Sequence, residues 1–119
     1  MYLMDYTVST PEVTVVISDI QSIDDDYYTG CLDVRYSGFL DVYYNCGYRH
    51  TGYVDFFFDD EENDLGVSWG LYEDAIYDED DNQYDSLPEH LKSIDITPLI
   101  SKNIDKILPE LKEFHNALS

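Results

Sequence analysis

The chain has 119 residues, of which 26 are Asp or Glu and only 6 are Lys or Arg, and its formal net charge at pH 7 is -20. This charge excludes direct binding to nucleic acid or to an anionic membrane, because proteins bind phosphate groups through Lys and Arg. The partner is expected to be basic, or a metal. The hydrophobic fraction of 44% and the aromatic fraction of 15% exceed those of disordered acidic tails. The sequence therefore predicts one folded domain over residues 1–119.

The sequence lacks the features of a secreted or membrane protein. No stretch approaches the roughly 20 apolar residues that span a bilayer, and the first residues have no basic and apolar signal segment. We therefore expect a soluble protein of the cytoplasm, or of the host cytoplasm if a phage encodes it. Cys31 and Cys46 have no CxxC spacing. They are expected to be reduced, partly buried thiols, with a disulfide as the alternative.

The negative charge is unevenly distributed along the chain. Residues 1–90 contain 22 acidic and two basic side chains, whereas residues 91–119 contain four of each. This asymmetry predicts an acidic, β-rich part that meets the partner and a charge-balanced helical part that supports the fold.

Apolar and polar residues alternate over most of residues 5–72, which is typical of half-buried strands. Acidic runs at 24–26 and 59–64 are expected to be turns, and Gly38 is expected to permit a turn or a bulge. The pattern predicts an antiparallel meander of about five strands. Its alternating sets are Val13, Val15 and Ile17; Leu32, Val34 and Tyr36; Leu40, Val42 and Tyr44; Val54, Phe56 and Phe58; and Leu65, Val67, Trp69 and Leu71.

Two helices are expected after Ser86, and they make the predicted fold class α+β. The segment 86–89 fits a capping box, which opens a short helix at about 87–94. Thr97-Pro98 opens a second helix at about 98–118, where apolar residues recur every three or four positions. Pro109 has no N–H to donate, so a kink or a break is expected near it. The apolar stripe is expected to cover one face of the sheet, with a helical dimer seam as the alternative.

The other face of the sheet is expected to mix carboxylates with aromatic rings. Side chains on one face of a strand repeat every 6.6 to 6.8 Å or so, and neighbouring strands lie about 4.8 Å apart. Such a lattice permits mimicry of DNA, which carries about one charge per 1.7 Å. A merely solvated or salt-adapted acidic surface is the alternative, but it would not need Tyr and Phe among its acids. The residues expected on this face are Asp33, Arg35, Asp41, Tyr43, Tyr53, Asp55, Phe57 and Asp59.

The candidate partner-binding residues are acids of strands and turns, with tyrosines among them as anchors. They are Asp24, Asp25, Asp26, Tyr27, Asp33, Asp41, Tyr53, Asp55, Asp59, Asp60, Glu61, Glu62, Asp64, Glu73, Asp74, Tyr77, Asp78, Glu79, Asp80 and Asp81.

Neither a metal site nor a catalytic site is predicted. Asp78, Asp80, Asn82 and Glu89 match positions of a calcium loop, but Gln83 stands where that loop requires Gly. The histidines fit no ligand or base motif, and the sequence has no P-loop, nucleophile elbow or dinucleotide-binding turn. We therefore expect no cofactor and no enzymatic activity.

These features resemble those of the small acidic DNA-mimic inhibitors of phages and mobile elements, which include anti-CRISPR and anti-restriction proteins and the uracil-DNA glycosylase inhibitor. The resemblance lies in the composition of about three quarters of the chain and aligns no motif. It implies a monomer or homodimer that binds the basic nucleic-acid-binding surface of a restriction or other nuclease, or of a CRISPR effector complex, and blocks DNA. An immunity protein against a basic nuclease toxin is the alternative.

Overall fold

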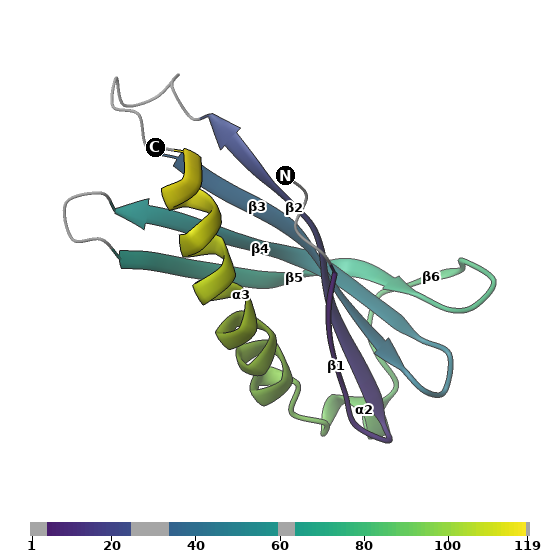
Figure 1. The fold of residues 1–119 in the computed structure, drawn as a ribbon. Coiled ribbons are helices and arrows are strands. Elements are labelled where there is room, and N and C mark those ends of the chain that lie inside the picture. Colours follow the sequence, from purple (N-terminus) through teal and green to yellow (C-terminus); the bar gives the residue numbers. More distant parts are fainter. Residues whose placement is uncertain (1–4, 25–33, 60–63, 119) are drawn as a thin grey trace.

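Residues 5–24, 34–59 and 64–118 are described by the computed structural model, in which one antiparallel sheet packs against a long helix (Figure 1). The sheet has six strands that neighbour one another in chain order. The molecule measures 45 × 28 × 23 Å. The elements are β1 (Tyr6–Ser9), β2 (Val13–Asp24), β3 (Val34–Tyr44), β4 (Arg49–Asp59), β5 (Asp64–Tyr77), β6 (Gln83–Tyr84), α2 (Glu89–Lys92) and α3 (Thr97–Leu118).

The α+β class and the antiparallel sheet are confirmed, but the strand count and the boundaries differ from the prediction. Strands β1 and β6 were not expected, and β5 continues to Tyr77 instead of ending near residue 72. Strand β6 pairs only with Ile76 and Tyr77 of β5. Within the described ranges, the outer edge of β5 from residue 64 to 75 therefore has no strand partner.

Gly38 is neither a turn nor the end of a strand. It lies inside β3, and the irregularity sits on β2, where Ser18 pairs with Phe39 but Gln21 already pairs with Ser37. A Cβ atom on Gly38 would lie 3.0 Å from the Ile20 side chain. The glycine thus makes room for a bulge on its neighbour, which sequence periodicity within one strand does not reveal.

A second irregularity separates the two halves of β5. Gly52 pairs with Leu71, whereas His50 pairs with Ile76, so β5 has extra residues between these pairs. A Cβ atom on Gly52 would lie 2.8 Å from the Leu71 Cα, so the two backbones approach too closely for any other residue at this position. The His50 Nε2–H donates a hydrogen bond to the Tyr72 carbonyl at 2.7 Å, which ties the irregular segment to β4.

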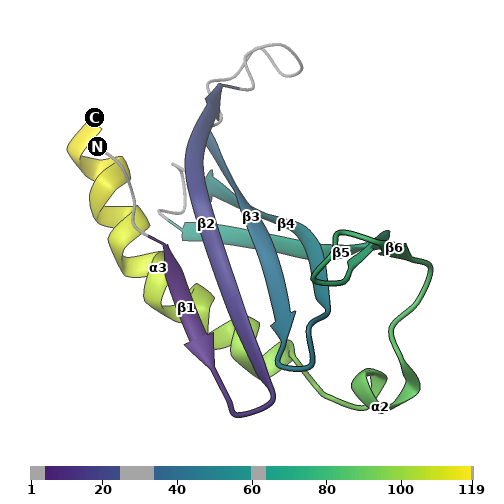
Figure 2. The same ribbon diagram turned by 90° about the vertical axis from the view of Figure 1, so that its right-hand side faces the viewer.

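Helix α3 covers one face of the sheet, which we call the covered face, and it lies closest to β1 and β2 (Figure 2). Ile100, Ile107 and Leu111 on the helix are fully buried. The predicted apolar stripe therefore covers the sheet. The sheet residues buried on the covered face include Val13, Val15, Ile17, Tyr36, Leu40, Val42, Tyr44, Val54, Phe56 and Phe58.

Several polar atoms within this interface have partners across it. The Asn103 Nδ2 atom donates to the Val15 carbonyl at 3.0 Å from the buried side of α3. The Tyr6 hydroxyl donates to the Glu110 carboxylate, and burial and this acceptor together raise the pKa of Tyr6. The Tyr36 hydroxyl lies 2.8 Å from His115 Nδ1. These contacts fix how the helix sits on the sheet.

The short helix differs from the prediction, whereas the long helix begins where it was expected. The short helix α2 has Pro88 at its N-cap, and no side chain caps it, so the predicted capping box and the span 87–94 are wrong. Helix α3 begins at Thr97, whose N–H donates to the Asp95 carboxylate at 3.1 Å. It continues through Pro109 without a break. Pro109 is exposed, so water can bind the carbonyl that it leaves without a donor. A kink at Pro109 stays a prediction.

The predicted burial of the cysteines is wrong for Cys46. This residue is an exposed free thiol, because it lies in the turn that joins the ends of β3 and β4 and no other element of the described residues covers it. Cys31 lies outside the described residues.

Candidate protein-binding surface

The face of the sheet opposite α3 carries the odd-numbered residues of β3 and β4, and we call it the open face. Register places Phe39 beside Tyr53, Ser37 beside Asp55 and Tyr43 beside Arg49. Sequence alternation placed its central members correctly. Those predicted open-face residues that the structure describes with their side chains are Arg35, Asp41, Tyr43, Tyr53, Asp55 and Phe57.

Aromatic rings lie along the open face, with Phe39, Tyr53 and Tyr72 together at its centre and Tyr43 and Phe57 four residues away along the strands in opposite directions. The exposed fraction is 60% for Phe39, 50% for Tyr72, 46% for Phe57 and 41% for Tyr43. Single exposed apolar residues are common on protein surfaces, but a contiguous group usually marks an interaction site. These rings share one side of adjacent strands, so the open face has the character of a protein-binding surface.

Carboxylates lie on both sides of the row that Phe39 and Tyr53 form. Along β3 the next open-face residue is Asp41, and along β4 it is Asp55. The Ser37 hydroxyl donates to Asp55 at 2.6 Å, which orients that carboxylate. Burial raises the pKa of Asp41, and the positive charge of Arg49 opposes this shift. Asp55 is therefore held by a hydrogen bond beside the rings, and Asp41 lies half-buried on their other side.

Arg49 shows how this surface can hold a cation. Its guanidinium carbon lies 5.3 Å from the centre of the Tyr77 ring, and its Nη2 atom lies 3.7 Å from the Asp81 carboxylate. The guanidinium thus lies over an aromatic face and beside an acid. Cation–π contact and charge pairing both favour this arrangement.

The acidic turn after β5 is organised by Asp78. Its carboxylate accepts hydrogen bonds from the Asp80 and Asn82 backbones at 2.9 and 3.0 Å, and from the Tyr84 hydroxyl at 2.7 Å. These donors, above all Tyr84, lower the pKa of Asp78 to about 2. The Asp78 carboxylate therefore stabilises its own turn.

Among the described residues, no group of three or more His, Cys, Asp or Glu side chains is placed to hold a metal ion.

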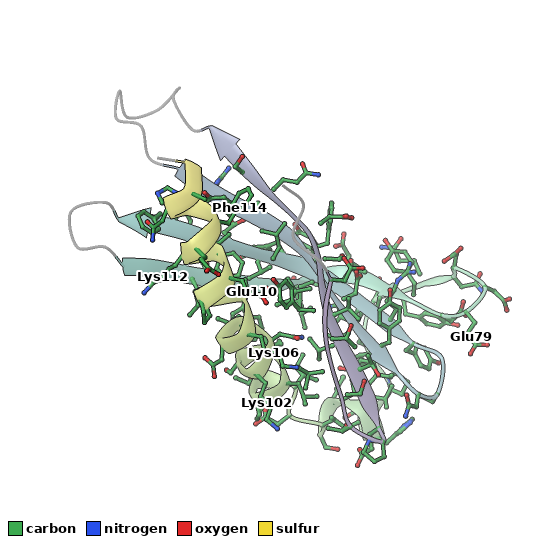
Figure 3. All side chains as sticks on the ribbon, viewed as in Figure 1. Glu79, Lys102, Lys106, Glu110, Lys112 and Phe114 are labelled. Carbon is green, nitrogen blue, oxygen red and sulfur yellow. The ribbon has the colours of Figure 1, made fainter. Side chains whose placement is uncertain are left out.

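The structure does not gather the candidate partner-binding residues into one patch. Asp24, Asp59 and Asp64 lie where β2 and β4 end and β5 begins, at one end of the sheet. Glu79 and its neighbours lie at the β5–β6 turn, and Figure 3 shows Glu79 far from Lys102 and Lys106 on α3. Asp41, Tyr53 and Asp55 lie between the two ends.

The remaining described candidates lie on β5 and in the turn after it. Glu73 and Asp74 on β5 are exposed and Tyr77 is half-buried, and Asp80 and Asp81 in the turn are exposed. The candidates outside the described residues are Asp25, Asp26, Tyr27, Asp33, Asp60, Glu61 and Glu62.

Sequence reasoning missed four residues that shape the open face: Phe39, Tyr72, Asp19 and Gln21. Phe39 has the same parity as Asp41, and this signal was hidden when Gly38 was interpreted as a possible turn. Asp19 has a φ of 53° in the β2 bulge, and Tyr72 lies in the irregular part of β5. No local pattern places either residue.

Comparisons with known proteins give no information on the role of this surface. No family model matches the sequence, and the searches of curated proteins and of solved structures found no match. No helix in the described parts of the chain is long and apolar enough to cross a membrane.

Proposed function

We propose that the protein binds a basic, nucleic-acid-binding protein through its open face and competes with DNA for that partner. The observation that carries the proposal is a group of exposed aromatic rings with Asp41 and Asp55 beside it, on a molecule whose net charge is -20. The few residues that carry most of the binding energy at protein interfaces are enriched in Trp, Tyr and Arg. Carboxylates beside them select a partner that presents Arg and Lys.

The distribution of charge supports competition with DNA. Acids mark both ends of a molecule that is 45 Å long, which is slightly more than one turn of duplex, about 34 to 36 Å. Three of the six basic residues lie on α3, away from Glu79 (Figure 3). The negative field would accelerate encounter with a basic channel. The partner class that fits is a defence nuclease or a CRISPR effector complex, and the protein acts as a DNA mimic.

The experiment is affinity capture from a lysate of the natural host, with DNA as competitor, followed by a DNA-binding assay with the captured partner. The wild-type protein should retain a nucleic-acid enzyme that DNA releases, and it should inhibit that enzyme's binding to DNA. The variant Asp41→Asn/Asp55→Asn should inhibit much more weakly.

The control variant Asp105→Asn/Glu113→Gln removes the same charge from exposed positions of α3. It should inhibit as the wild type does. Equal inhibition by all three proteins would overturn the proposal. Capture of a single toxin that DNA does not release would instead support an immunity protein.

A further inference from the structure

A pocket of about 280 Å³ lies on the open face and spans β2 to β5. Its floor includes the backbone of Gly38 and Gly52. The side chains around it are those of Asp19, Gln21, Ser37, Phe39, Tyr53 and Tyr72. Its walls are thus three aromatic rings, and an acid lies at its rim.

The local backbone explains why the pocket exists. The bulge on β2 turns Asp19 toward it through a left-handed conformation, with a φ of 53°. The Tyr53 ring lies over Gly70, where a Cβ atom would come within 3.0 Å of the ring. Tyr72 stands beside it, with 5.7 Å between the two ring centres and an angle of 40° between their planes. Two bulges and one glycine therefore place rings from different strands around one cavity.

This combination suits a cation with a flat shape. The faces of aromatic rings attract cations, and the attraction strengthens where water is excluded. A guanidinium is planar, weakly hydrated and able to stack on a ring while it pairs with a carboxylate. An ammonium is compact and strongly hydrated, so it loses more on entering an apolar cavity. Arg49 lies over Tyr77 and beside Asp81 on the same sheet, which is the same chemistry within the molecule itself.

We infer that this pocket receives an arginine side chain of the basic partner, with its guanidinium against Phe39, Tyr53 and Tyr72 and its charge facing Asp19. The inference relies on the proposed function for the identity of the partner, but the pocket's preference for arginine is a property of this chain alone.

The first test is a titration of the isotope-labelled protein with a short capped peptide that has one central arginine, followed by NMR at about 0.15 M salt. Matched peptides carry lysine or citrulline at the same place. The arginine peptide should shift the amide signals of Gly38, Gly52 and Tyr72. The lysine peptide should bind several-fold more weakly, and the neutral citrulline peptide should not bind. Equal binding of arginine and lysine, or shifts confined to the acidic turns, would overturn the inference.

Single substitutions test whether the arginine peptide binds in the pocket. Tyr53→Leu should weaken binding of the arginine peptide about tenfold, because it removes a ring face. Tyr53→Phe, which keeps the ring, should restore it. Tyr84→Leu changes an exposed ring of β6 outside the pocket and should stay within about twofold of wild type. If Tyr84→Leu weakens binding as much as Tyr53→Leu, the surface attracts cations without a specific pocket.

The two proposals fail in different ways. If a captured nucleic-acid enzyme binds Tyr53→Leu and wild type equally, the pocket inference is wrong while the proposed function stands. If the arginine peptide binds in the pocket but no captured protein competes with DNA, the inference stands and the proposed function is wrong.

Discussion

The covered face and the open face are built from alternate residues of the same strands, yet they serve different purposes. On the covered face Tyr36, Val54 and Phe56 are fully buried beneath α3, whereas on the open face Phe39 is 60% exposed. Burial of apolar area stabilises a fold, while exposed rings stabilise a complex. The comparison teaches that stability and binding are separated between the two faces. A substitution should therefore affect mainly one of them.

The largest expected effect concerns the side of α3 that packs on the covered face. Leu111→Ala removes a fully buried side chain and should lower the free energy of unfolding by about 2 to 5 kcal/mol. Phe39→Ala on the open face should change it by less than about 1 kcal/mol while it weakens partner binding. Urea unfolding measures both values. Similar losses of stability in the two variants would contradict the separation of the faces.

Two glycines on paired strands sharpen the same contrast. Gly52→Ala would force a Cβ atom against the backbone of β5, within 2.8 Å of the Leu71 Cα, and should cost about 1 to 3 kcal/mol. Gly70→Ala meets only the Tyr53 ring, which can move. It should leave the melting temperature almost unchanged but reduce binding of the arginine peptide. Thermal unfolding and the peptide titration distinguish them, and a stable Gly52→Ala would show that the two strands can separate.

Salt should affect the whole molecule through its net charge of -20. Like charges repel one another, and ions screen this repulsion at separations beyond about 8 to 10 Å. The melting temperature should therefore rise between low salt and roughly 0.3 M salt. Calorimetry at several ionic strengths tests this expectation. A constant melting temperature would mean that bound cations already compensate the acids.

Ionised Asp41 on the open face should slightly lower the stability of the folded protein at pH 7. Burial raises the pKa of Asp41 in the folded state, so the folded protein binds its proton more tightly than the unfolded chain does. Its contribution to stability is present below the unfolded pKa and is lost as pH rises through the folded pKa. Asp41→Asn should remove this loss and slightly stabilise the protein at pH 7. Unfolding measured against pH in both proteins tests the sign, and a destabilised variant would contradict it.

Asp78 should show the opposite dependence and the smallest effect. Its pKa is lowered to about 2 by hydrogen bonds, mainly from Tyr84, so its contribution is present above the unfolded pKa and is lost as pH falls through about 2. Asp78 is exposed to solvent, so its loss should loosen the turn without unfolding the sheet. NMR titration of the carboxylate and of the Asn82 amide measures this. An ordinary carboxylate pKa would show that the turn does not hold these hydrogen bonds in solution.

The sequence predicted the residues of each face wherever the strands are regular. Val42 and Val54 were placed on the covered face and Asp41 and Asp55 on the open face by their parity, because a strand alternates its side chains whatever its partners are. A bulge was one of the two alternatives expected at Gly38, but its place on β2 and the irregularity in β5 could not be predicted in this way. They depend on close approach between Gly38 or Gly52 and a neighbouring strand, which is a tertiary property.

The site was predicted less completely for the same reason. The pocket forms where these irregularities bring Asp19 and Tyr72 next to regular positions such as Phe39. The acids at the turns were prominent in the sequence, but sequence alone did not show that Asp78 is engaged within its own turn.

The outer edge of β5 has a consequence for how concentrated the protein can become. Residues 65–72 form the longest run in the chain without a charged side chain, and an unpaired, uncharged edge is a template for pairing with another copy. Each molecule has a net charge of -20, and the repulsion between molecules keeps such edges apart. Protonation of the carboxylates at low pH would remove that repulsion. The negative charge that favours a basic partner therefore also prevents self-association. Without this charge, the protein should assemble edge to edge into fibres.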